Sequence, residues 1–397
     1  MSKQDLKAPP VDTAEAKPSN NGQRPERPLF AVSPELDRSG SARAQRRVRH
    51  EMKKLRNRAL GPVKWAAYQT GQTRLVPPPD RMYIESTNLC NLDCVMCPTG
   101  LKQISRPKGY MDFDLFKAVV DEMAPYVKAT TLHIWGEPLM HKRIFDMIAY
   151  CRQKGLRAEI STNATLLDER KAKGLLEAGL GTIYLCLDGF RPETYESIRV
   201  KADFERTNTN IRRFLELKTQ GGYAHPYVNL QIIQMEKTMP EIDEFIAKWS
   251  LPGVDNINVK PFDSWGGQVE AISDLRADDP ASFVPQERYA CPNLWYHVHV
   301  YWDGRLAMCD RDFNLNYDLG SVISPGGQVE VMKNWNGPKM QELRRLHVQG
   351  EAGTVSPCDK CVEWAWWRPR LFGGYGNYNA VVLEDQGDRD SGMGSSQ

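Results

Sequence analysis

The placement of cysteines constrains this 397-residue chain more than any other feature of its sequence. Three of its nine cysteines, Cys90, Cys94 and Cys97, share one short loop with the spacing C-x3-C-x2-C. A structural zinc site normally uses four ligands and is closed. Three thiolates instead suit a 4Fe–4S cluster that leaves one iron open to a substrate or cosubstrate. On spacing alone, zinc or a chance arrangement is the alternative.

The other cysteines divide into a second group and two single residues. The second group is Cys291, Cys309, Cys358 and Cys361. An odd number of cysteines, clustered in this way, indicates metal or cluster ligation rather than disulfides. Cys151 and Cys186 stand apart and are expected to be small apolar core residues.

The charge and apolar composition of the chain argue against two classes of protein, nucleic-acid binders and membrane proteins. The 52 Lys+Arg against 50 Asp+Glu argue against a dedicated nucleic-acid binder. No run of 18 apolar residues predicts a transmembrane helix, and the N-terminus has no apolar core of a secretory signal. We therefore expect a cytoplasmic protein.

The first 80 residues differ from the rest, because they carry twice as many Lys+Arg as Asp+Glu. We expect residues 1–80 to be a disordered basic extension with one amphipathic helix over residues 44–60. Such a helix could contact an acidic membrane surface or a partner, or it could dock on the folded body.

Strand and helix patterns then alternate as far as residue 261. Strands are expected at 81–85, 129–134, 158–161, 182–187, 227–235 and 256–261, and helices at 113–126, 142–154, 168–178, 208–220 and 239–249. This alternation predicts an α/β fold with a parallel sheet. Six strands fall short of a full barrel, so we expect a partial (β/α)6 barrel with its reacting groups at the C-terminal strand ends.

The alternation of strands and helices ends after this core, which we place at residues 81–265. Residues 266–290 read as a linker, and Asp303-Gly304 predicts a hairpin turn between strands 295–301 and 305–309. With a helix at 338–348, this gives a small β-hairpin/α domain over residues 291–365. Residues 366–397 read as a loose tail.

The region from about Met82 to Cys361 resembles the radical S-adenosylmethionine (SAM) superfamily. The resemblance lies in Glu85-Ser86-Thr87-Asn88-Leu89-Cys90-Asn91-Leu92-Asp93-Cys94-Val95-Met96-Cys97, which is close to the defining motif. It implies that an open iron chelates SAM. Reductive cleavage would then give a 5′-deoxyadenosyl radical that abstracts hydrogen from a substrate. It also implies an electron donor such as flavodoxin or ferredoxin.

The resemblance further implies contacts to SAM. Gly136 and Glu137, in Trp135-Gly136-Glu137-Pro138, look like the element that receives the SAM amino group. Ser161 and Asn163 resemble the element that contacts ribose and methionine, although Ser-Thr-Asn also fits a helix N-cap. Arg199 is placed for the SAM carboxylate or is a solvated helix-end residue.

Two positions depart from the family pattern. Met96 replaces the usual aromatic residue beside adenine, and its thioether can still cover a purine face. Cys186 stands where the family often has serine. If it faces the barrel interior, its S–H can return a hydrogen atom to a substrate radical.

The second cysteine group resembles the twitch domain, a short relative of the SPASM module. This resemblance predicts one auxiliary, fully ligated 4Fe–4S cluster, with a zinc ribbon as the alternative. Asp310, Arg311 and Asp312 follow a cluster cysteine and either bind a polar substrate or form a solvated turn. Lys260 and Asp263, at the sixth strand's end, are further candidates.

A closed cluster near the substrate can accept an electron from a substrate radical. We therefore expect oxidation or epimerisation of a small polar molecule such as a sugar, an aminocyclitol or a nucleotide-linked sugar. The alternatives are a peptide maturase of the same superfamily and, more remotely, a non-enzymatic zinc or cluster protein.

Overall fold

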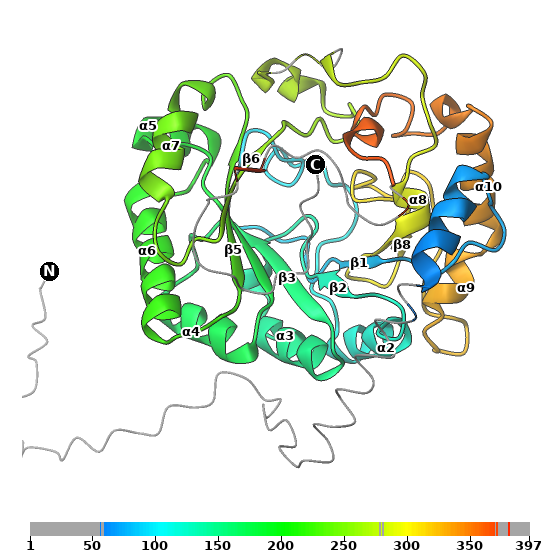
Figure 1. The fold of residues 1–397 in the computed structure, drawn as a ribbon, viewed down its shortest axis with the longest axis horizontal. Coiled ribbons are helices and arrows are strands. Elements are labelled where there is room, and N and C mark those ends of the chain that lie inside the picture. Colours follow the sequence, from blue (N-terminus) through cyan, green and yellow to red (C-terminus); the bar gives the residue numbers. More distant parts are fainter. Residues whose placement is uncertain are drawn as a thin grey trace, which may run out of the picture.

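A computed structural model describes residues 56, 59–277, 279, 282–369, 371 and 380–381. Its centre is one sheet whose described strands follow the order β8-β7-β1-β2-β3-β4-β5-β6-β9 (Figure 1). The strands are β1 Arg81–Ile84, β2 Ala129–Thr131, β3 Arg157–Thr162, β4 Thr182–Cys186, β5 Tyr227–Ile233, β6 Asn256–Lys260, β7 His297–Val300, β8 Leu306–Ala307 and β9 Ala380–Val381.

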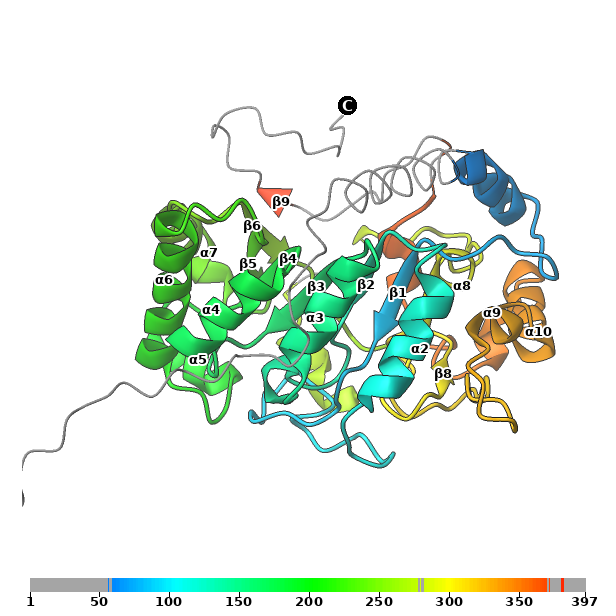
Figure 2. The same cartoon turned by 90° about the horizontal axis from the view of Figure 1, so that it is seen from below.

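The strands β1 to β6 pair in sequence order and are all parallel. This arrangement confirms the expected partial barrel. The intervening helices lie outside the sheet (Figures 1 and 2). They are α2 Phe113–Met123, α3 Ile144–Gln153, α4 Glu169–Ala178, α5 Pro192–Ile198, α6 Phe204–Gln220 and α7 Ile242–Trp249. The sequence pattern did not predict α5, which has only seven residues.

Acidic side chains start three of these helices. Asp112, Asp168 and Asp203 each accept hydrogen bonds from backbone N–H groups of the first turn of α2, α4 and α6. These N–H groups have no partner inside the helix, and an acidic cap also complements the helix dipole. Gly179 ends α4 with a φ of 78°, a left-handed conformation that glycine adopts without strain.

The sheet continues beyond the six expected strands, because β7 pairs in parallel with the free edge of β1. β7 and β8 form the expected antiparallel hairpin, and Gly304 takes a φ of 82° in its turn. The hairpin that begins the C-terminal cysteine region therefore extends the barrel sheet. The short helices α8 Asn293–Tyr296 and α9 Val331–Trp335 and the longer α10 Pro338–Val348 lie at this end of the molecule (Figure 1).

The two faces of the sheet differ in chemistry. On β5, Val228 and Leu230 belong to the large apolar core that packs under the helices. Asn229 and Gln231 alternate with them and point to the opposite face, because strand side chains have a period of two. We call this opposite face the inner face. Other polar residues that alternation places on it are Tyr83, Ser161, Tyr184, Asn258, His297 and His299.

The sequence predicts a linker at residues 266–290 and a loose tail from residue 366, but parts of both segments are packed in the described structure. In the expected linker, Ile272 is buried, and a 3-10 helix runs over Glu270–Leu275. At the start of the expected tail, Trp366 and Trp367 are buried, and the Trp367 ring stacks on His297 at 5.3 Å. Most of the predicted basic helix 44–60 lies outside the described residues, whereas residues 61–69 are helical.

Candidate active site

The loop with Cys90, Cys94 and Cys97 follows β1, at the C-terminal edge of the parallel strands, as expected. Backbone hydrogen bonds hold it against the end of α5: Asp93 N donates to Val200 O, and Val95 N donates to the Ile198 carbonyl. Burial raises the pKa of Cys90 to about 11 and that of Cys94 to about 12. Such thiols lose their protons when a metal takes the proton's place, so this donor set fits a cluster.

Gly136 brings the segment after β2 into contact with the cysteine loop. A Cβ at this position would lie 2.3 Å from Thr87 O and 2.7 Å from Leu89 O, so only glycine fits without a shift of the backbone. Glu137 N also donates to Leu89 O at 2.8 Å. The glycine therefore fixes where this segment meets the loop.

The Glu137 carboxylate is buried and already accepts three hydrogen bonds. The donors are Leu139 N at 3.0 Å, Thr162 Oγ1 at 2.8 Å and Asn163 N at 2.9 Å. Burial raises the pKa of Glu137, and these donors oppose the rise. A carboxylate offers about four acceptor positions, so Glu137 ties the β2 and β3 ends together and keeps limited capacity for a ligand.

Asn163 connects the end of β3 with the cysteine loop. Its Nδ2 donates to Asn91 Oδ1 at 3.1 Å and lies 3.9 Å from Cys90 Sγ. Its Oδ1 accepts from the backbone N and hydroxyl of Thr165, at 3.0 and 2.7 Å. Asn163 thus serves as a local cap and also reaches the cysteine site.

Arg199 is mostly shielded from solvent, with 12% of its side chain exposed. Its Nε donates to Asp188 Oδ2 at 2.8 Å, and its Nη1 lies 3.8 Å from Cys94 Sγ. Asp188 also accepts from Ile233 N through Oδ1, at 2.9 Å. The Asp188 charge keeps the pKa of Arg199 well above its usual value although burial acts against it. No local sequence pattern indicates this role for Asp188, because its partner is eleven residues away.

Cys186 ends β4 on the inner face. Its Sγ lies 3.1 Å from Ser161 Oγ on β3, and Gln231 Nε2 donates to it at 3.5 Å. Burial raises the pKa of Cys186, which keeps it a thiol. His133 lies beside this pair, since its Nδ1 accepts from Ser161 N at 2.9 Å. Burial lowers the pKa of His133 to about 3, so its imidazole is neutral.

Two other predicted residues have apolar surroundings. Cys151 is completely buried in the core under the helices, as expected for a packing residue. The Met96 side chain lies in a smaller apolar cluster with Cys94 and Trp135. Its carbonyl accepts from Trp265 Nε1 at 2.7 Å, which fixes the backbone beside Cys97.

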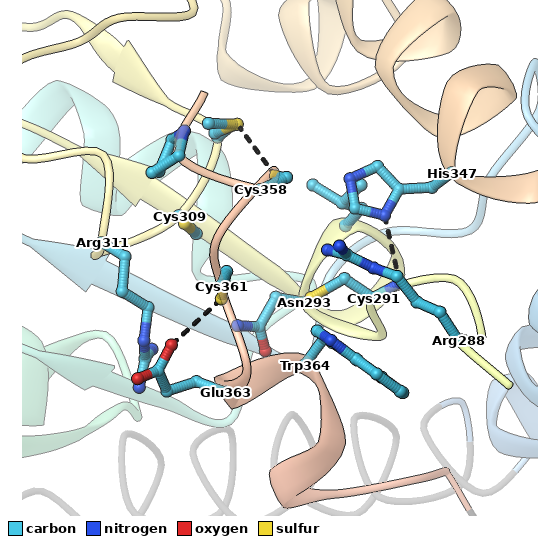
Figure 3. A pocket seen from close by; sticks show the side chains of 13 residues that line it. Arg288, Cys291, Asn293, Cys309, Arg311, His347, Cys358, Cys361, Glu363 and Trp364 are labelled. Atoms are coloured by element: carbon cyan, nitrogen blue, oxygen red, sulfur yellow. Dashed lines mark hydrogen bonds between the residues drawn. The ribbon is translucent and has the colours of Figure 1, made fainter. Parts of the chain in front are cut away.

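The four C-terminal cysteines line one cavity of about 420 Å³ that includes space open to solvent (Figure 3). They reach it from the segment before α8, from the residues after β8 and from the loop after α10. Burial raises the pKa of Cys291 to about 11 and that of Cys358 to about 12. Four thiols that line one space, instead of converging on a single point, fit a multi-iron cluster. We call this space the auxiliary cavity.

Asp310 and Arg311 lie between the auxiliary cavity and the inner face. Arg311 Nη1 donates to Asp310 Oδ1 at 2.6 Å, and its Nη2 donates to Asp263 Oδ2 at 2.8 Å. Burial would raise the pKa of Asp310, but the charge of Arg311 and the nearby His299 hold it at about 2. Asp310 is thus an ionised carboxylate beside a cysteine of the cavity.

The remaining candidates near this point have separate roles. Asp312 is fully buried and accepts from Asn316 N at 2.6 Å and Tyr317 N at 3.1 Å, so it stabilises a turn. The solvated-turn alternative is therefore wrong for Asp312 and for the buried Arg311. The Lys260 ammonium lies over the rings of Trp265 and Trp366, at 5.6 and 6.0 Å.

One buried ion pair joins the two cysteine regions. Arg106, in the segment after the first cysteine loop, makes two hydrogen bonds to Glu85 at the end of β1. Its Nε donates to Phe313 O at 2.6 Å, and its guanidinium lies 4.0 Å from the centre of the Tyr301 ring. No local sequence pattern predicts this pair, because the partners are 21 residues apart.

A three-cysteine loop at the end of a barrel strand and a four-cysteine cavity together define an iron–sulfur protein built on a partial barrel. Comparisons with known proteins agree. The model of the radical SAM superfamily matches residues 84–237, and that of an iron–sulfur cluster-binding domain matches residues 291–362. The chain belongs to the radical SAM superfamily. It uses SAM and a 4Fe–4S cluster, and its C-terminal SPASM domain binds further iron–sulfur.

Individual relatives extend this result. A probable GTP 3′,8-cyclase from Methanothermobacter marburgensis is 30% identical over 69% of this chain and 82% of the relative. The Fe-coproporphyrin III synthase of Methanosarcina barkeri is 41% identical over 42% of this chain, and this match spans only 41% of the synthase. SuiB of Streptococcus suis, in a crystal structure with SAM, has a TM-score of 0.58 at 12% identity, covering 76% of each chain. At this identity, the likeness to SuiB concerns the fold.

The helices give one further result. Within the described part of the chain, none combines the length and the apolar character needed to cross a membrane.

Proposed function

We propose that this chain is a radical SAM oxidoreductase or epimerase with two 4Fe–4S clusters. Cys90, Cys94 and Cys97 hold the SAM-binding cluster. The four cysteines of the auxiliary cavity hold the second cluster. The observation that carries this proposal is the convergence of those four thiols, from three separate segments, on one cavity.

When bound, SAM and its cluster would supply a 5′-deoxyadenosyl radical for abstraction of hydrogen from the substrate. Around them, Gly136 lets the backbone approach SAM, and the carboxylate of Glu137 has limited capacity left for the SAM ammonium. Ser161 and Asn163 contact ribose and methionine from the end of β3. Arg199, positioned by Asp188, lies near the SAM carboxylate. Met96 covers one side of the adenine. A flavodoxin or ferredoxin donates the electron.

The inner face supports a small polar substrate. Imidazoles, phenols and amides line it, and hydrogen bonds such as Asn258 Nδ2 to Gln231 Oε1, at 3.1 Å, hold them in place. His299 Nδ1 is buried without a hydrogen-bond partner among the described residues. Buried polar groups are normally paired, so a hydroxyl-rich molecule such as a sugar, an aminocyclitol or a nucleotide-linked sugar suits this face.

Two residues decide the outcome of the reaction. Asp310 accepts a hydrogen bond from a substrate hydroxyl and takes up its proton if the carbon is oxidised to a ketone. When bound, the auxiliary cluster supplies an electron acceptor for the same oxidation. Cys186 instead returns a hydrogen atom from the inner face, which inverts the carbon. Its 3.1 Å contact with Ser161 holds the sulfur at the strand end.

A peptide maturase is the second candidate function, and the fold shared with SuiB, solved in complex with a precursor peptide, favours it. Relatives support radical chemistry without singling out a substrate, since they are named for Fe-coproporphyrin III and for GTP. The buried polar residues of the inner face favour a small molecule over a peptide.

The proposal is tested by anaerobic reconstitution, with counts of iron and sulfide per chain. We expect about eight irons, falling to about four when Cys291 and Cys309 are replaced by alanine. Reductant-dependent formation of 5′-deoxyadenosine should accompany the first cluster and disappear in a Cys94→Ala variant. Stoichiometric zinc in place of iron would contradict the proposal.

A further inference from the structure

Three N–H groups around the auxiliary cavity have no hydrogen-bond partner among the described residues. They are Arg288 Nε, Arg311 Nε and His347 Nε2, and all three atoms are buried. The residues line the cavity together with the four cysteines (Figure 3). Buried donors in native proteins are almost always paired. Their acceptor is therefore expected inside the cavity.

Hydrogen bonding places the proton of His347 on the nitrogen without a partner. Cys291 N donates to His347 Nδ1 at 3.3 Å. A ring nitrogen that accepts a hydrogen bond carries no proton, so the neutral imidazole has its proton on Nε2. His347 thus presents a donor beside Cys291, on the same side of the cavity as Arg288 (Figure 3).

Arg311 presents its donor from the other side. Asp310 and Asp263 occupy its two terminal nitrogens, at 2.6 and 2.8 Å, and so fix the guanidinium group. Only Nε is left without a partner in this part of the structure. Figure 3 shows Arg311 beside Cys361 and Glu363.

Two carboxylates oppose these donors: Asp310, which follows Cys309, and Glu363. Glu363 Oε2 accepts from Cys361 Sγ at 3.1 Å, and its Oε1 accepts from the backbone N and hydroxyl of Ser264. The negative charges of both carboxylates disfavour the addition of an electron nearby. Three N–H donors and the positive charge of Arg288 act in the opposite direction, whereas the charge of Arg311 is already balanced by its ion pairs with Asp310 and Asp263.

Resting on the proposed function, we propose that His347, Arg288 and Arg311 donate hydrogen bonds to sulfur atoms of the auxiliary cluster and raise its reduction potential. Hydrogen bonds to cluster sulfurs and the local charge set this potential. A cluster gains negative charge on reduction, so N–H donors stabilise its reduced state more than its oxidised state. A higher potential favours the transfer of one electron from a substrate radical to the cluster, with release of the hydroxyl proton as the radical becomes a carbonyl compound.

The test is an anaerobic redox titration of the reconstituted holoenzyme, followed by EPR. In His347→Met, which neither accepts from Cys291 N nor donates to the cavity, we expect reduction to be about tenfold less favourable. This corresponds to a midpoint about 59 mV more negative for one electron. His347→Gln keeps an acceptor and a donor and should recover most of the shift. The SAM-binding cluster of the same sample is the internal control and should not change.

Arg288 provides a second variant at a less buried side chain. Arg288→Met should shift the auxiliary midpoint in the same direction with its irons retained. Unchanged midpoints in both His347→Met and Arg288→Met would overturn the proposal. If His347→Met loses its cluster, the Arg288→Met result decides. In wild-type enzyme labelled with 15N-histidine, pulsed EPR should detect a histidine nitrogen coupled to the reduced auxiliary cluster. A wild-type chain with about four irons would contradict the proposed function instead.

Discussion

Replacing Arg106 by methionine tests how the two cysteine regions are held together. The Glu85 carboxylate is completely buried, and Arg106 makes two of its hydrogen bonds. The substitution leaves Trp302 N, at 3.3 Å, as its remaining hydrogen-bond donor in the described structure. Removing one partner of a buried ion pair costs about 3–5 kcal/mol, because the other charge stays buried and unpaired.

The loss should depend on pH in a defined direction. Burial raises the pKa of Glu85 above its usual value, and Arg106 opposes this rise. Without Arg106 the folded-state pKa rises further, so the folded variant binds a proton that the unfolded chain has released. The destabilisation is therefore largest above this folded-state pKa and shrinks as the pH falls through it.

Thermal unfolding of the reconstituted enzyme measures this effect. Arg106→Met should lower Tm on the order of 5–10 °C near pH 8, and by less near pH 5. The double variant Glu85→Gln/Arg106→Met removes the unpaired charge and should regain part of the loss. The contrary result is a double variant as unstable as Arg106→Met at every pH. The buried charge would then not be the cause, and the reasoning would be refuted.

Three further predictions concern the SAM site. Gly136→Ala should abolish SAM binding and remove the irons of the first cluster, because its Cβ would lie 2.3 Å from a carbonyl oxygen. The auxiliary irons should stay. An iron count measures this, and Gly353→Ala, with open space around it, is the matched control. Asp188→Asn should weaken SAM binding about tenfold or more in equilibrium dialysis, because it leaves the Arg199 charge buried with a neutral partner. Glu342→Gln, which removes an exposed ion pair, should leave SAM binding unchanged. Cys186→Ala should abolish an epimerised product while 5′-deoxyadenosine still forms; unchanged turnover would remove Cys186 from the mechanism and favour oxidation.

The sequence predicts most of the barrel because its signals are local. Hydrophobic periodicity locates the first six strands, and the helix 338–348 agrees with α10 at both ends. The cysteine spacing likewise locates both cysteine sites, since three ligands lie on one loop. In each case, residues close in sequence carry the pattern.

The parts that sequence reasoning missed depend on contacts between distant segments. The pairing of β7 with β1 joins strands more than 200 residues apart, and no local pattern selects that edge. The partner of Arg106 and the positions of His133 and Asp188 follow from how strand ends meet in space. The polar character of the inner face becomes visible only when the alternation of all its strands is combined.

The position of β7 explains why both cysteine sites border the same inner face. β7 and β8 carry the chain to Cys309, and the four residues after it cross toward the first site. On the way, Arg311 binds Asp263 after β6, and Phe313 O accepts from Arg106 beside the first cysteine loop. This short segment thus contacts a cysteine of the auxiliary cavity at one end and the SAM-site loop at the other. A substrate on the inner face would lie against it, so a substitution here should alter substrate binding and both cysteine sites together.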